Sequence, residues 1–64
     1  MEFDTLVRRV RGEFLEMPGL RLTPAQAERL WGLDQEICRR VIASLVGTSF
    51  LRHTPGGSIV RADA

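Results

Sequence analysis

The sequence predicts a small, mainly helical domain that ends in a β-hairpin, and three observations lead to this fold class. An apolar stripe at helical spacing occupies residues 1–17, two further segments begin with helix-capping residues, and two β-prone runs flank Pro55-Gly56-Gly57. A chain of 64 residues and 7.2 kDa is expected to form one domain over residues 1–64, without room for a catalytic domain beside a regulatory one.

Composition is typical of a folded globular protein and not of a disordered one. Hydrophobic residues make up 44% of the chain and charged residues 27%, which is enough apolar surface for a core. One cysteine cannot form an intramolecular disulfide, and the chain has no N-terminal apolar leader and no 18-residue apolar run. We therefore expect a cytoplasmic protein that does not enter a membrane.

The first expected helix covers residues 1–17. Its apolar residues recur at the i, i+3, i+4, i+7 spacing of one helix face, and they are Phe3, Leu6, Val7, Val10, Phe14 and Met17. Gly12 lies opposite this stripe and weakens the helix by about 1 kcal/mol relative to alanine. Pro18-Gly19 then ends the helix, because the residue before a proline is pushed out of the helical region.

The second expected helix is the most clearly marked. Residues 20–22 alternate apolar and polar and form an extended link that suggests a minimal strand. Thr23 and Gln26 have the spacing of a capping box, and Pro24 suits the first helical position. The helix then runs to about Trp31, and Gly32 ends it.

The third expected helix covers residues 35–46. Asp34 is suited to its N-cap, where a negative charge is favourable, and Gly47 is suited to the left-handed position after its end. Its buried positions are expected to be Ile37, Cys38, Val41, Ile42 and Leu45.

The C-terminal part of the chain predicts a hairpin. Residues 50–54 and 58–62 are rich in strand-forming side chains, and Pro55-Gly56-Gly57 between them supplies turn residues. The expected core of the whole domain consists of Phe3, Leu6, Val10, Phe14, Ala27, Leu30, Leu33, Val41, Leu45, Leu51 and Val60.

This order of helix, short strand, helix, tight turn, helix and hairpin resembles a winged helix-turn-helix domain. The helix-turn-helix would occupy residues 23–46 and the wing hairpin residues 50–62. Ala27 and Gly32 are five positions apart, one more than in many helix-turn-helix sequences. The resemblance implies non-enzymatic binding of duplex DNA, related to transcription, with helix 35–46 as recognition helix in the major groove.

Six residues are the candidate DNA contacts: Gln35, Arg39, Arg40, Arg52, His53 and Arg61. Arginine and glutamine side chains can hold phosphates or pair with base edges. Residues 47–64 carry two arginines and one acid, whereas residues 1–22 and 23–46 are balanced. The alternative is a solvated helix face, because Glu36 lies one turn from both Arg39 and Arg40 and, with Asp34, repels phosphate.

A second function class is a protein-interaction module on the same scaffold without DNA binding. The net charge of +1 argues against a strongly basic nucleic-acid-coating protein. Leu15, Leu20 and Trp31 would then form a partner or homodimer surface, although Trp31 also suits the core between the second and third helices. A lone domain of this size would bind DNA weakly, so useful affinity requires a dimer or a larger assembly.

Enzymatic and metal chemistry are not expected. His53 is the only histidine and Cys38 the only cysteine, which is too few soft ligands for a zinc site. Cys38 lies on the apolar side of its helix, as a buried inert thiol would. We therefore expect no catalytic residues, no cofactor and no small-molecule substrate.

Overall fold

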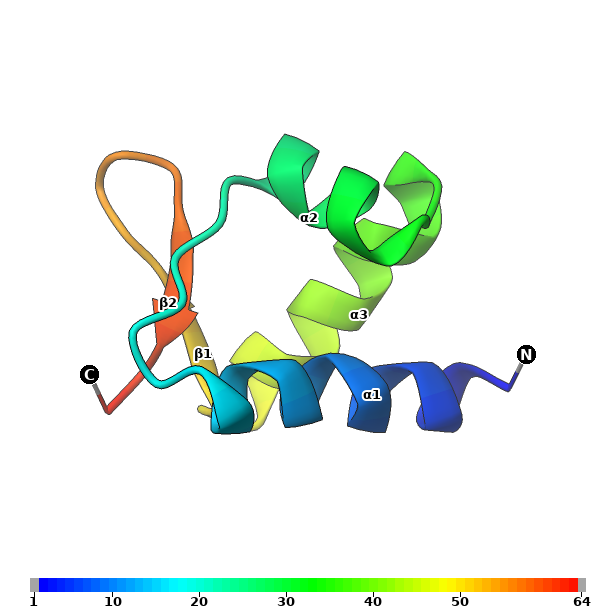
Figure 1. Cartoon of the computed structure of the whole chain (residues 1–64), viewed down its shortest axis with the longest axis horizontal. Helices are drawn as coiled ribbons and strands as arrows, with labels where there is room; N and C mark the ends of the chain where they lie inside the picture. Colours follow the sequence, from blue (N-terminus) through cyan, green and yellow to red (C-terminus); the bar gives the residue numbers. More distant parts are fainter. Residues whose placement is uncertain (1, 64) are drawn as a thin grey trace.

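A computed structural model describes residues 2–63, and it contains three helices followed by an antiparallel hairpin (Figure 1). The elements are α1 (Phe3–Glu16), α2 (Pro24–Trp31), α3 (Gln35–Gly47), β1 (Leu51–His53) and β2 (Ile59–Arg61). Helix α1 lies along one side, α2 and α3 pack above it, and the hairpin stands at the end where α1 finishes. The predicted mainly helical domain with a small hairpin is thus confirmed.

Both predicted helix caps are formed. The Thr23 hydroxyl accepts from the Gln26 backbone N–H at 3.2 Å, and the Thr23 N–H donates to Gln26 Oε1 at 2.9 Å. Asp34 Oδ1 accepts from the Ile37 N–H at 2.8 Å. These contacts satisfy backbone donors that a helix start would otherwise leave unpaired. They fix where α2 and α3 begin, and therefore the short turn between them.

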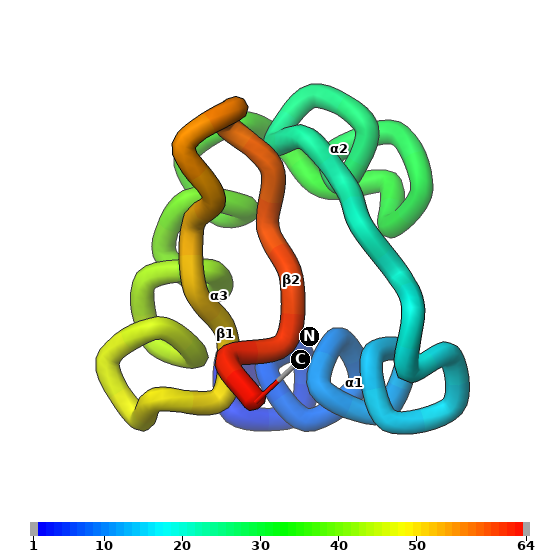
Figure 2. The backbone as a smooth tube through the Cα atoms, turned by 90° about the vertical axis from the view of Figure 1, so that its left-hand side faces the viewer, coloured from blue at the N-terminus to red at the C-terminus, as the bar shows by residue number. Residues whose placement is uncertain are grey.

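The hairpin is extended by the link before α2. Strands β1 and β2 pair antiparallel, with Leu51 opposite Arg61 and His53 opposite Ile59. Leu22 forms an isolated antiparallel bridge to Ile59, so the predicted minimal strand at residues 20–22 is reduced to one bridged residue. Figure 2 shows the resulting order, with the link beside β2, β2 beside β1, and β1 beside α3.

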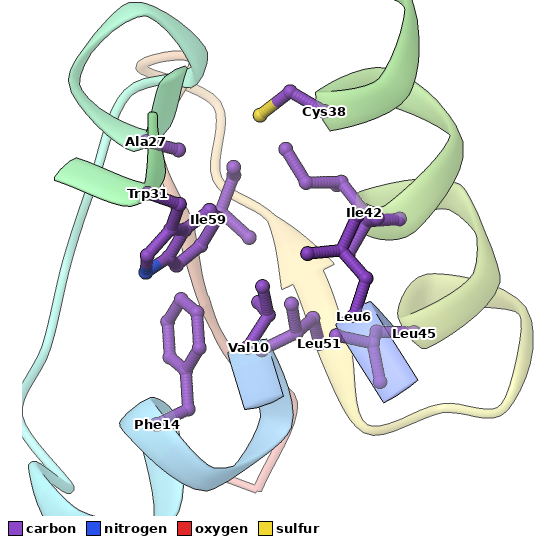
Figure 3. Close-up of a cluster of buried hydrophobic side chains, with 11 residues drawn as sticks. Leu6, Val10, Phe14, Ala27, Trp31, Cys38, Ile42, Leu45, Leu51 and Ile59 are labelled. Carbon is purple, nitrogen blue, oxygen red and sulfur yellow. The ribbon is translucent and has the colours of Figure 1, made fainter. Parts of the chain in front are cut away.

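The core lies between the three helices and the inner face of the hairpin (Figure 3). Its buried members are Leu6, Val10, Phe14, Ala27, Trp31, Cys38, Val41, Ile42, Leu45, Leu51 and Ile59. Leu33 and Phe3, which were expected in the core, are partly buried and pack against it. Every element thus contributes to one apolar cluster, which fixes α3 relative to the hairpin.

Two predicted core residues lie elsewhere. Leu30 is 51% exposed, because the adjacent Trp31 takes the inward position at the end of α2. In β2 the buried residue is Ile59 and not Val60. Successive strand side chains point to opposite faces, so a shift of one residue exchanges the inner and outer sets.

Helix α3 ends later than predicted, because Gly47 is still helical. The left-handed residue is Ser49, with φ of 64°. The Phe50 N–H donates to the Leu45 carbonyl and the Ser49 N–H to the Val46 carbonyl, both at 3.0 Å. This pair of bonds is the Schellman arrangement, and it sets the direction in which the chain enters β1.

Candidate nucleic-acid interface

The outer face of α3 carries three of the residues predicted to contact DNA, namely Gln35, Arg39 and Arg40. Its exposed residues are Gln35, Glu36, Arg39, Arg40, Ala43 and Gly47. Consecutive helical residues are about 100° apart, so Arg39 and Arg40 lie toward opposite edges of this face. Ala43 and Gly47 lie between them, and their small size leaves the helix backbone accessible.

Arg39 lies on the hairpin side of α3. It lines a hollow of about 220 Å³ together with Pro24, Ile42, Ala43 and His53. The hollow therefore joins the start of α2, the middle of α3 and the end of β1. Pro24 and Ala43 were not predicted as site residues, although Ala43 follows Arg39 at the i+4 spacing that marks a common helix face.

Arg40 lies on the opposite edge, toward α1. Its guanidinium carbon is 5.6 Å from the centre of the Phe3 ring. A cation over an aromatic face is attracted by the negative potential of the ring. Arg40 therefore supports the packing of α1 on α3 and presents its charge at the rim of the candidate interface.

The first turn of α3 is acidic, as the sequence predicts. Asp34 is used as the helix cap, and its carboxylate remains exposed, as does that of Glu36. Gln35 is exposed at the first helical position. Within residues 2–63, neither Arg39 nor Arg40 forms an ion pair with Glu36, so Glu36 does not neutralise either guanidinium group.

The predicted basic residues of the hairpin do not form one group. Arg52 pairs with Val60, whereas His53 pairs with Ile59, so Arg52 and His53 point to opposite faces of the hairpin. Both side chains are exposed. Only His53 lies on the side that meets α3 and Arg39.

Arg61 is partly buried and lies opposite Leu51, away from the hairpin turn. Its Nη2 donates to Asp63 Oδ2 at 2.9 Å, and its side chain is only 22% exposed. Its guanidinium carbon lies 5.5 Å from the centre of the Phe50 ring. Arg61 is thus engaged with Asp63 and Phe50 and lies apart from the Arg39 and His53 hollow.

The expected partner surface is dispersed, and Trp31 does not belong to it. Trp31 is 5% exposed and packs in the core, so its expected role in a partner surface is wrong and its core role is confirmed. Leu20 is half-buried against the core, and Leu15 is 45% exposed. Met17, expected on the apolar stripe of the first helix, and Leu30, expected in the core, are exposed instead.

Cys38 is buried, as expected for a structural thiol. Burial raises the pKa of the Cys38 thiol above its usual 9.0, and the nearby negative charge of Glu28 raises it further. A thiol held in its protonated form is a poor nucleophile and a poor metal ligand. In the described part of the chain, no three His, Cys, Asp or Glu side chains lie close enough together to hold a metal ion.

Comparisons with protein-family models, with curated proteins and with solved structures each find no match. The candidate interface consists of Arg39, Arg40 and Ala43 on α3 and His53 on β1.

No helix among residues 2–63 combines the length and apolar character needed to cross a membrane.

Proposed function

We propose that this protein is a winged-helix protein that binds duplex DNA, with α3 in the major groove and the hairpin beside the phosphate backbone. The order of its elements supports the proposal, because a link bridged to β2 precedes two capped helices and a hairpin follows them. Winged helices that bind DNA place the second helix of the motif in the groove. We further propose a role in transcription and a cytoplasmic location.

The observation that carries the proposal is that Arg39 and His53 line the same hollow. One side chain comes from the helix that would read bases and the other from the hairpin that would follow the backbone. A nucleic-acid strand that crosses this junction would meet both polar groups together. Contacts with phosphate fix the position of a protein on DNA, and contacts with base edges select the sequence.

The small residues of α3 support a close approach to DNA. Ala43 is exposed between the two arginine edges, and Gly47 follows it one turn later. Their size allows the groove edges to approach the helix, while Arg39 and Arg40 reach outward on either side. Arginine can donate two hydrogen bonds to one guanine or to one phosphate. In this proposal Arg40 acts as a second anchor, and Gln35 contacts adenine.

The hairpin contributes through His53 and, from its other face, through Arg52. Arg61 has a supporting role in this proposal, because its guanidinium is already occupied by Asp63 and Phe50. The number of cations on the interface is small. We therefore propose that two copies, or a larger assembly, bind DNA together and add their phosphate contacts.

A titration of fluorescent mixed-sequence duplex DNA tests the proposal. Each phosphate contact adds about −0.9 to the slope of log K against log salt, so three contacts weaken binding about 40-fold between about 50 and about 200 mM salt. Steep weakening of this kind is expected. Absence of binding at the lower salt concentration would contradict DNA binding.

The second candidate is a protein-interaction module on the same scaffold. The acidic start of α3, formed by Asp34 and Glu36, favours it because both carboxylates are exposed where a recognition helix would meet phosphates. In that case α3 would dock on a partner protein through Arg39, Arg40 and Ala43. Duplex binding that is absent at about 50 mM salt would favour this candidate over the first.

A further inference from the structure

A second, larger hollow lies on another part of the surface, between α1 and the end of α3. It has a volume of about 420 Å³, and its polar lining consists of Arg11, Ser44, Thr48 and Ser49. Val7, Leu45 and Phe50 form its apolar floor. Three of the lining residues, Thr48, Ser49 and Phe50, belong to the turn from α3 into β1, which is yellow in Figure 2. None of these residues lines the hollow that contains Arg39 and His53.

The Arg11 guanidinium lies over the Phe50 ring, and both residues line this hollow. Its carbon atom lies 4.9 Å from the centre of the Phe50 ring, and that of Arg61 lies 5.5 Å from the same centre. The two cations are therefore no farther apart than the sum of these distances. Asp63 pairs with Arg61, and no carboxylate among residues 2–63 pairs with Arg11. The local charge at the hollow is positive.

The hydroxyl groups add hydrogen-bond donors beside this charge. Within the described residues, the hydroxyls of Ser44 and Ser49 form no hydrogen bond, whereas Thr48 Oγ1 donates to the Leu45 carbonyl at 3.1 Å. The nearby helix carbonyls are already engaged, because backbone N–H groups of residues 48–50 donate to Ser44, Leu45 and Val46. The rim thus offers donors and a cation, and few open acceptors.

We infer that this hollow binds a small tetrahedral oxyanion, namely a phosphate group. Arg11 would supply a two-pronged charged contact, because the guanidinium fork matches two phosphate oxygens. Ser44 and Ser49 would donate to the remaining oxygens from the opposite wall. The contact with Phe50 favours one position of the Arg11 guanidinium before binding, which reduces the entropy lost on binding. This hollow shares no lining residue with the one that contains Arg39 and His53, and the inference does not rest on DNA binding.

A titration of the ¹⁵N-labelled full chain with sodium phosphate tests the inference, with sodium chloride at equal ionic strength as the reference. Saturable shifts are expected at the backbone amides of Ser44, Thr48 and Ser49. Shifts that are equal in chloride, that do not saturate, or that spread over the whole surface would overturn the inference.

Variants then test which side chains hold the anion. Arg11→Gln is expected to weaken phosphate binding about tenfold or more, since a charged hydrogen bond is lost. Ser44→Ala is expected to weaken it less and to leave the contact between Arg11 and Phe50 in place. Arg9→Gln, an exposed arginine of the same helix outside the hollow, is the matched control and should bind as the natural chain does. Equal affinities for Arg11→Gln, Ser44→Ala and the control would overturn the inference.

A titration in the presence of duplex DNA distinguishes the two sources of the phosphate group, which are free phosphate and the DNA backbone. If the occupant is a free phosphate, saturating duplex leaves the phosphate shifts unchanged. If the occupant is a backbone phosphate, duplex displaces free phosphate and Arg11→Gln weakens duplex binding. Either result supports an oxyanion site. The titration without DNA shows whether the hollow binds phosphate even if the chain binds no duplex.

Discussion

The rings of Phe14 and Trp31 meet edge to face, with centroids 6.1 Å apart and an interplanar angle of 61° (Figure 3). This contact joins the end of α1 to the end of α2. Such aromatic pairs add about 0.5–1.5 kcal/mol beyond the burial of their surface. Trp31 makes this contact from its inward position, whereas the adjacent Leu30 is 51% exposed.

Substitution of Trp31 tests its core role. Its Nε1 is buried, and no acceptor in the described part of the chain lies within hydrogen-bond distance. Trp31→Phe therefore removes volume but no hydrogen bond, and we expect it to lower the free energy of unfolding by about 1–2 kcal/mol, against about 3–5 kcal/mol for Trp31→Ala. Urea unfolding measures both. Equal losses for the two variants would contradict this packing.

Gly12 and Gly32 predict opposite effects of the same substitution. A Cβ at Gly12 would meet nothing within 4 Å, and Gly12 lies inside α1. Gly12→Ala should stabilise the fold by about 1 kcal/mol. Gly32 has φ of 64°, so Gly32→Ala should destabilise it by about 1 kcal/mol. Thermal unfolding of the pair checks the signs, and equal signs would contradict the assigned backbone.

Ser49 predicts a stabilising substitution to glycine. Its φ of 64° is costly for a residue with a Cβ, so Ser49→Gly should raise the free energy of unfolding by about 0.5–1 kcal/mol. Ser49→Ala removes the hydroxyl but keeps the Cβ, and it serves as the control. Stabilisation by alanine as large as that by glycine would show that the backbone is not the cause.

The buried Cys38 thiol predicts a loss of stability at high pH. Its pKa is raised above 9.0 by burial and, secondarily, by Glu28, so the unfolded chain loses this proton before the folded chain does. The protonated thiol contributes fully to the free energy of unfolding at pH values below 9.0, the ordinary pKa of the group. This contribution declines as the pH rises from there toward the raised pKa of the folded state. Urea unfolding of the natural chain and of Cys38→Ala, each from about pH 7 to about pH 10, measures the free energy of unfolding of both proteins. The difference between them should shrink at high pH, and a constant difference would contradict the shift.

Local signals in the sequence were sufficient to predict the helices. The capping box of Thr23 and Gln26, the Asp34 cap and the left-handed Gly32 each act within four residues, so the sequence alone indicates where α2 begins and ends and where α3 begins. The predicted end of α3 was wrong because glycine is the residue most often found in the left-handed position after a helix, and Gly47 was assigned to it. The left-handed residue of the Schellman arrangement is Ser49, two residues later.

Relations between distant segments could not be predicted in the same way. The bridge from Leu22 to Ile59 selects Ile59 as the buried residue of β2, and no pattern within the hairpin reveals it. The same register decides that His53, and not Arg52, lies on the face of the hairpin that meets α3. The occupation of Arg61 by Phe50 and Asp63 also depends on the packed fold, so the six predicted contacts could not be sorted into groups from the sequence.

Binding of a mixed-sequence duplex by Arg39→Ala, measured over a series of salt concentrations, tests the proposed interface most directly. Arg8→Ala, an exposed arginine of α1 outside both hollows, is the matched control. We predict that Arg39→Ala weakens binding and reduces the slope of log K against log salt by about 1 for each copy bound, while Arg8→Ala leaves both unchanged. Equal behaviour of the two variants, or a duplex affinity that does not depend on Arg39, would contradict DNA binding through α3.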